Sequence, residues 1–185
     1  MKNKEELIIS DTNIFIDLFN TNLLKEFFNL PYKIKTSVLV FSELKEDKQL
    51  LAIKPFIDSQ KLQVDNLSKN SFNTCYTMKL ITPGDLSIAD CSVWLMAKTE
   101  NGKLITNDKN LRKAATKDNV DVRGLFYIFD EMLKNKLITF EKAIEVTDFL
   151  IKNNNRFPLK IAETKMEEWN NKKSKKTIKE IERIR

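Results

Sequence analysis

Short apolar stretches alternate with longer segments in which apolar residues recur at helical spacing. The short stretches predict strands at residues 7–9, 32–36, 62–64 and 103–106, with an edge strand at 120–122. The longer segments predict helices at residues 14–19, 23–28, 38–44, 48–58, 68–80, 87–100, 109–115, 125–133 and from Thr139 onward. Alternating strands and helices are typical of a central, mostly parallel sheet flanked by helices. The predicted fold class is therefore α/β.

Polar residues at the ends of these segments predict where several helices begin and end. Thr36 or Ser37, Ser68 and Ser87 each precede a helical segment, as N-cap residues do. Gly102 follows the predicted helix 87–100, in the place of a C′ glycine, and is expected to end it.

Asp11 directly follows the first predicted strand, Leu7–Ile9, and a second apolar stretch begins at Ile14. A carboxylate between two apolar segments is costly to desolvate unless something compensates its charge. The carboxyl ends of strands in an open α/β sheet also border the ligand crevice. Asp11 is therefore either a turn-forming Asx residue or a ligand for a cation.

The composition indicates one folded domain. The chain has 185 residues, of which 42% are hydrophobic, with twelve Phe, which is enough for a well-filled core. Three Gly and four Pro are too few for a turn-rich β-sandwich. No apolar run approaches the ~18 residues of a membrane span, and the N-terminus lacks the apolar segment of a signal peptide. We therefore expect a cytoplasmic protein with no membrane contact.

The chain contains no histidine, which excludes several kinds of catalytic site. Ser-His-Asp triads, HExxH zinc sites and ribonucleases with imidazole as acid and base all require it. Cys75 and Cys91 lack CxxC spacing and are expected to be reduced, half-buried small apolar residues. A hydrolase of this composition would need carboxylates and a metal ion.

The end of the chain differs from the rest in charge. The net charge is +6, and residues 160–185 contribute nine Lys or Arg and five Glu, a net of +4. Leu159, Ala162, Met166 and Trp169 form a thin apolar stripe before a lysine cluster at 172–176. We expect a folded domain at residues 1–158 and a basic helical tail at 159–185. The stripe is compatible with docking on the domain, a second copy or a partner, and equally with a solvated tail.

Four acidic residues occupy similar places near the ends of successive strands: Asp11, Glu43, Asp90 and Asp108. Strand ends and helix starts share one edge of a parallel sheet, so these side chains are expected to converge. Clustered carboxylates raise one another's pKa unless a cation neutralises them. Oxygen ligands of this kind suit Mg²⁺ or Mn²⁺ rather than zinc.

Each acidic residue also has a purely structural interpretation. Asp11 fits an Asx-turn, and Glu43 lies in a charged stretch that fits a solvated surface. Asp90 completes a capping box with Ser87, and Asp108 fits the N-cap of the following helix. The case for a site rests on the four together.

The ordered set of motifs resembles the PIN domain, the fold of VapC-type toxins and other metal-dependent ribonucleases. The matching stretches are Ile9–Phe15, Ser42–Leu44, Leu86–Cys91 and Leu104–Asp108. The resemblance implies that the acids at these positions hold Mg²⁺ or Mn²⁺, with two supporting polar residues; the ligands are Asp11, Glu43, Asp90 and Asp108, and the supporting residues Asn13 and Thr106.

The resemblance implies a metal-dependent endoribonuclease that hydrolyses RNA phosphodiester bonds, as the toxin of a toxin–antitoxin pair. A cognate antitoxin and a homodimer are the implied protein partners. The alternative is a catalytically silent PIN-like module that binds RNA or protein. Asp85 either joins the site or belongs to the turn at Pro83–Gly84. Candidate phosphate-binding residues are Lys35, Lys109, Arg112, Lys113 and Arg123.

Overall fold

The computed structural model describes residues 6–154 and 157–184, with side chains described up to residue 174. The chain forms two compact units, Met1–Leu125 and Phe126–Arg185. The domain boundary that the sequence predicts, between residues 158 and 159, remains a prediction. Among the described residues, no helix is long and apolar enough to cross a membrane.

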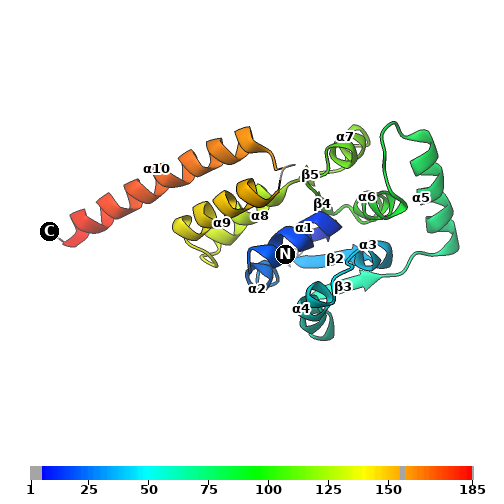
Figure 1. Ribbon diagram of the computed structural model, residues 1–185, viewed down its shortest axis with the longest axis horizontal. Helices are drawn as coiled ribbons and strands as arrows, with labels where there is room; N and C mark the ends of the chain where they lie inside the picture. The colour runs from blue at the N-terminus through cyan, green and yellow to red at the C-terminus, as the bar shows by residue number, and fades with distance from the viewer. Residues whose placement is uncertain (1–5, 155–156, 185) are drawn as a thin grey trace, which may run out of the picture. The chain divides into compact units, whose positions relative to one another are not determined.

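The first unit is built on a five-stranded sheet in which every pair of neighbouring strands is parallel (Figure 1). The strands are β1 (Leu7–Ser10), β2 (Lys33–Ser37), β3 (Leu62–Asp65), β4 (Lys103–Ile105) and β5 (Val122–Arg123), in the order β3-β2-β1-β4-β5. Ile8 and Ile9 of the central strand are fully buried, as expected where helices cover both faces of a parallel sheet. The predicted α/β fold class is confirmed.

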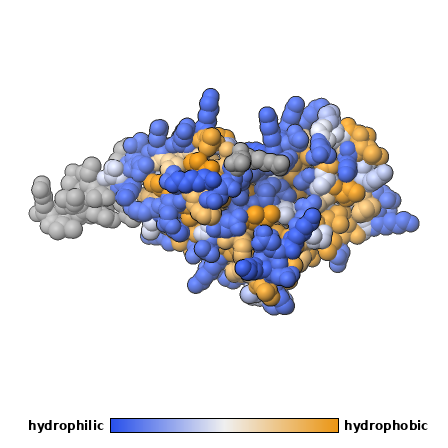
Figure 2. All heavy atoms as spheres, viewed as in Figure 1, coloured by the Kyte–Doolittle hydropathy of each residue, from blue (hydrophilic) through white to orange (hydrophobic). Residues whose placement is uncertain are grey.

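Seven helices of the first unit connect and cover these strands within the described residues. They are α1 (Thr12–Asn20), α2 (Leu24–Phe27), α3 (Val38–Ser42), α4 (Asp47–Asp58), α5 (Lys69–Ile81), α6 (Ile88–Glu100) and α7 (Lys109–Lys117). Helix α6 packs against β1, β2 and β4, and α5 packs on α6. Leu80 and Ile81 of α5 are exposed and add to the apolar surface of this helix (Figure 2).

The predicted N-caps are confirmed. The hydroxyl oxygens of Ser37, Ser68 and Ser87 accept hydrogen bonds from backbone N–H groups in the first turns of α3, α5 and α6. These contacts satisfy N–H groups that have no partner inside the helix. Local signals therefore determine where these helices begin.

Three local predictions are wrong. The helix predicted to reach Leu44 ends at Ser42, so that Glu43 follows α3 rather than lying inside it. The left-handed residue that ends α6 is Asn101, with φ of 54°, rather than Gly102. A Cβ at Gly102 would lie 3.1 Å from the Leu7 side chain, so this glycine permits close packing on β1 instead. Finally, the two free cysteines are fully rather than half buried.

The described residues of the second unit form three helices. These are α8 (Leu125–Lys134), which begins at the last residue of the first unit, α9 (Phe140–Asn153) and α10 (Leu159–Ile184). Trp169 on α10 is fully buried, and its ring lies 6.3 Å from that of Phe129 on α8. The indole N–H donates to Asp130 Oδ1 at 2.9 Å, and Lys165 donates to Asp130 Oδ2 at 2.7 Å. The apolar stripe of the predicted tail is therefore docked on the preceding helices at Trp169.

Replacing this tryptophan should destabilise the second unit. We expect Trp169→Ala to lower the free energy of unfolding by about 3–5 kcal/mol, because the change leaves a cavity and an unpaired carboxylate oxygen on Asp130. Trp169→Phe keeps a ring but loses the indole N–H, and should lie between wild type and Trp169→Ala. Urea unfolding followed by circular dichroism measures the difference. Equal unfolding midpoints for all three proteins would contradict the docked position of α10.

Candidate active site

The candidate site is built around Asp11, which follows the central strand and caps α1. The backbone N–H of Asp11 donates to the carbonyl of Ile105 at 3.1 Å, so the chain leaves β1 beside the end of β4. The residue is only 2% exposed. The order of the strands therefore brings Asp11 together with the polar residues that follow β4.

Three neighbouring groups donate hydrogen bonds to the Asp11 carboxylate. The backbone N–H of Thr12 reaches Oδ1 at 2.7 Å. The hydroxyl of Thr106 reaches Oδ2 at 2.6 Å, and the side-chain amide of Asn13 donates to the same oxygen. The two residues predicted to support the site thus both contact Asp11.

The pKa values of Asp11 and Asp90 show that four carboxylates influence one another. The pKa of Asp11 is raised to about 7, because burial and the charges of Asp90 and Glu43 together outweigh the hydrogen bonds from Thr106 and Thr12, which lower it. Burial also raises the pKa of Asp90, with contributions from the charges of Asp108 and Glu43. The structure therefore places the four predicted acids in one electrostatic environment.

Asp90 and Asp108 make the hydrogen bonds that their structural interpretations require, and Glu43 makes a contact that its interpretation did not include. Asp90 Oδ2 accepts from the backbone N–H of Ser87 at 2.7 Å, which completes the predicted capping box. Asp108 Oδ1 accepts from the N–H of Leu111 at 2.7 Å as the N-cap of α7. Glu43 is exposed, and its Oε2 accepts from the Thr12 hydroxyl at 2.7 Å.

Each of these three contacts uses a single carboxylate oxygen. Within the described part of the chain, no protein hydrogen bond reaches the second oxygen of Asp90, Asp108 or Glu43. An oxygen of each carboxylate therefore remains able to bind another group while the existing hydrogen bond stays intact.

The donor set fits a hard divalent cation, although not as a complete protein cage. Among the described residues, no group of three His, Cys, Asp or Glu side chains lies close enough to hold a metal ion. Mg²⁺ usually keeps several waters and binds through one or two carboxylates together with substrate phosphate. Asp11 and Asp90, both buried enough to have raised pKa values, fit such a pair of ligands.

The candidate phosphate-binding residues differ in their surroundings. Lys35 is buried and forms ion pairs with Asp65 at 3.0 Å and Glu100 at 2.8 Å, so its predicted role in binding phosphate is not supported. The guanidinium of Arg112 is half-buried and donates to the carbonyl of Thr106 at 2.9 Å. Burial and the nearby Arg123 lower the pKa of Arg112.

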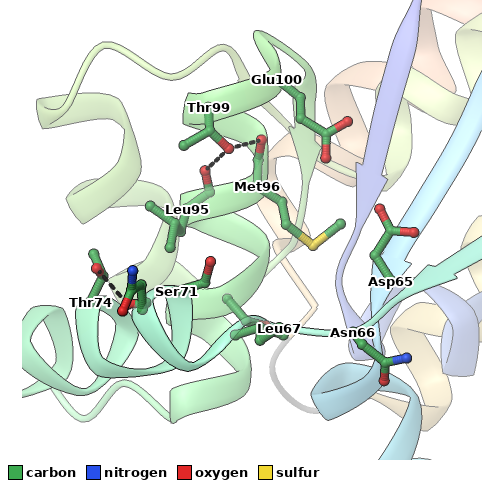
Figure 3. A pocket seen from close by; sticks show the side chains of 11 residues that line it. Asp65, Asn66, Leu67, Ser71, Thr74, Leu95, Met96, Thr99 and Glu100 are labelled. Carbon is green, nitrogen blue, oxygen red and sulfur yellow. Dashed lines mark hydrogen bonds between the residues drawn. The ribbon is translucent and has the colours of Figure 1, made fainter.

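The four acids do not line the cavity drawn in Figure 3. This cavity of about 360 Å³ lies between the end of β3, α5 and α6, where the carboxylates of Asp65 and Glu100 flank Met96. Asp85 is exposed, and its charge is not among the main causes of the raised pKa of Asp11 or Asp90.

The sequence alone indicates no role for Asn107, although this residue lies inside the motif Leu104–Asp108. The residue stands between Thr106 and Asp108, and its backbone N–H donates to Asn13 Oδ1 at 3.1 Å. The available signal was an asparagine directly before a predicted N-cap.

The raised pKa of Asp11 predicts how the stability of the metal-free protein depends on pH. Above about pH 4 the unfolded chain releases the Asp11 proton, whereas the folded chain keeps it until about pH 7. The free energy of unfolding should therefore decrease as the pH rises through this window, by roughly 4 kcal/mol for a shift of this size. No histidine titrates in the same range, because the chain has none.

Thermal unfolding in EDTA between about pH 5 and pH 8 tests this expectation. The Tm of the wild type should fall with rising pH, and that of Asp11→Asn, which cannot ionise at this position, should fall less. Equal pH dependence in the two proteins would contradict a raised pKa for Asp11.

Solved structures with low sequence identity resemble this chain. A PilT N-terminus domain protein from Sulfolobus solfataricus P2 is 16% identical, with a TM-score of 0.44 over 69% of this chain and 93% of that one. PAE2754 from Pyrobaculum aerophilum is 11% identical, with a TM-score of 0.51 over 71% and 99%. VapBC2 from Rickettsia felis, bound to a DNA fragment from its promoter, is 19% identical, with a TM-score of 0.45 over 64% and 98%. The likeness to PAE2754 supports the fold alone.

No curated protein matches the chain. The family model DUF3368, described as a PIN domain, matches residues 7–171 and so covers both the sheet with its acidic edge and much of the second unit. The chain belongs to the PIN domain family.

Proposed function

We propose that the protein is a metal-dependent endoribonuclease that hydrolyses RNA phosphodiester bonds, with its active site at Asp11, Glu43, Asp90 and Asp108. The observation that carries this proposal is the buried Asp11 carboxylate, which is 2% exposed and has a pKa raised to about 7. A buried carboxylate beside other carboxylates is costly. A divalent cation removes that cost, and perturbed acids are typical of functional sites.

Different residues have different proposed roles at this site. Asp11 and Asp90 would bind the cation, and Glu43 and Asp108 would complete or position the cluster through the carboxylate oxygens that their protein hydrogen bonds leave open. Thr106 and Asn13 hold Asp11 Oδ2 in place. When bound, Mg²⁺ or Mn²⁺ lowers the pKa of an attacking water and neutralises charge at the phosphate.

RNA is the proposed substrate because cations lie next to the acids. Arg112 contacts Thr106, and Lys109 and Lys113 are exposed on α7, which begins directly after Asp108. Such residues bind flanking phosphates and position a strand without reading its sequence. Single-stranded or looped RNA is the substrate class that we propose.

Two substitutions test the site. We expect Asp11→Asn and Asp90→Asn each to abolish cleavage of a mixed structured RNA in Mg²⁺ or Mn²⁺, because each removes a charged ligand while keeping the shape of the side chain. EDTA should abolish cleavage by the wild type. Asp85→Asn is the matched control and should cleave normally, since Asp85 is exposed and its charge is not among the main causes of the pKa shifts of the site.

The outcomes separate the candidate functions. Cleavage that survives in both variants would reject these residues as the site. Metal-independent, salt-sensitive RNA binding without cleavage by the wild type would favour the catalytically silent module.

We also propose that the protein is the toxin of a toxin–antitoxin pair, acts on cytoplasmic RNA as a homodimer and is inhibited by a cognate antitoxin. This proposal extends the family membership to its VapC-type members. Induced expression in a bacterium should arrest growth, and expression of Asp11→Asn should not, because arrest would require cleavage. Normal growth with soluble wild-type protein present would contradict the toxin role.

A further inference from the structure

Asn107 has a hydrogen-bonding partner for each of three polar groups. Its backbone N–H donates to Asn13 Oδ1 at 3.1 Å. Its side-chain Nδ2 donates to Asp17 Oδ2 at 3.3 Å, and its Oδ1 accepts from the backbone N–H of Leu125 at 3.1 Å. One half-buried residue therefore joins the turn after β4 to helix α1 and to the first residue of α8.

We propose that Asn107 is a positioning residue of the active site, which sets the geometry of Asp11 and Asp108 for binding a divalent cation. The inference rests on the proposed function and adds a residue that contacts neither the substrate nor the cation. Asn107 acts through Asn13 on one side and through the backbone of Asp108 on the other.

The contact with Asn13 determines which end of that amide faces Asp11. Asn13 Oδ1 accepts from the backbone N–H of Asn107, so Asn13 Nδ2 is turned toward Asp11 Oδ2 and the Thr106 hydroxyl. With the opposite orientation a carbonyl oxygen would face the carboxylate and repel it. The position of residue 107 thus decides whether Asn13 stabilises the Asp11 anion.

The side chain of Asn107 fixes that position from two sides. Asp17 is 5% exposed and lies one helical turn after Asn13 on α1. The contacts of Asn107 with Asn13 and Asp17 therefore attach the turn after β4 to one face of α1. Leu125 is the first residue of α8, and its N–H is one that the helix itself cannot satisfy. Loss of the Asn107 amide would release the turn on both sides.

Gly124 allows the close approach that the Asn107 side chain requires. A Cβ at this position would lie 3.0 Å from Asn107 Oδ1 and 3.3 Å from Nη1 of Arg112. Both distances are shorter than ordinary van der Waals contact, so a larger residue here would displace the amide. The chain therefore provides a matched space for Asn107.

The same turn carries the acid that follows β4. The backbone N–H of Asp108 donates to Thr106 Oγ1 at 3.0 Å, and that hydroxyl donates in turn to Asp11 Oδ2 at 2.6 Å. A displaced turn would move Asp108 and Asp11 relative to each other. Contacts that orient metal ligands are commonly worth 10- to 100-fold in metal affinity or activity.

Asn107→Ala should therefore weaken metal binding more than RNA binding. We expect the Mg²⁺ concentration for half-maximal cleavage to rise by roughly 10-fold or more, with little change in the KM for RNA at saturating Mg²⁺. In RNA-free protein, the concentration of Mn²⁺ needed to raise the Tm should increase by a similar factor. Asn110→Ala, an exposed asparagine on α7, is the matched control and should behave as wild type.

A paired exchange distinguishes positioning from general destabilisation. Asn107→Asp alone places two carboxylates together and should weaken metal binding. Adding Asp17→Asn lets the amide at position 17 donate to the carboxylate at position 107, so that donor and acceptor are exchanged. Mn²⁺ binding should then return to within a few-fold of wild type, because either side chain at position 107 has an oxygen that accepts from the N–H of Leu125.

Each outcome decides between the two proposals. If Asn107→Ala binds Mn²⁺ as tightly as wild type, whether or not its Tm in EDTA is lower, the positioning role is overturned while the proposed nuclease stands. If the wild type itself shows no Mn²⁺-dependent rise in Tm and no metal-dependent cleavage, the proposed function fails and the inference fails with it.

Discussion

The buried carboxylate of Asp11 is the constraint on which the site depends. It stands at the end of the central strand, where a parallel sheet collects the ends of its neighbours. Its hydrogen bonds come from Thr12, Asn13 and Thr106, residues that follow β1 and β4. Since burial and like charges disfavour its ionised form, the fold holds Asp11 in a state that a cation would stabilise.

The elements predicted correctly from the sequence are those with local signals. Ser37, Ser68 and Ser87 cap helices through contacts within three residues, and a short apolar run is enough to indicate β1. One candidate role is not supported because distant partners decide the surroundings of the side chain. Lys35 is a candidate phosphate-binding residue in the sequence, but its ion pairs come from Asp65 and Glu100, 30 and 65 residues away. Such pairings follow from strand order and helix packing, which no local pattern encodes.

The structural and functional interpretations of the acids are compatible with each other. The sequence allows Asp90 and Asp108 to be either cap residues or ligands, and both do cap their helices. A cap requires one carboxylate oxygen, and each side chain has two. The helix start thus fixes the direction of the side chain and leaves the second oxygen for another partner. What the sequence could not provide was the separation of the four carboxylates, which depends on how α6 packs across β1 and β4.

That separation bears on how a cation would be bound. Among the residues that the structure describes, no three acids are close enough to form a complete site. If all four carboxylates were in contact before a cation bound, their repulsion would further disfavour the ionised form of Asp11, whose pKa is already raised to about 7. A phosphate group of the substrate and water supply the remaining oxygens in many magnesium sites. An arrangement in which Asp11 and Asp90 bind directly, while polar residues such as Asn107 set the approach of Asp108, avoids that repulsion. In the proposed function, the cation and the RNA would therefore complete the site together.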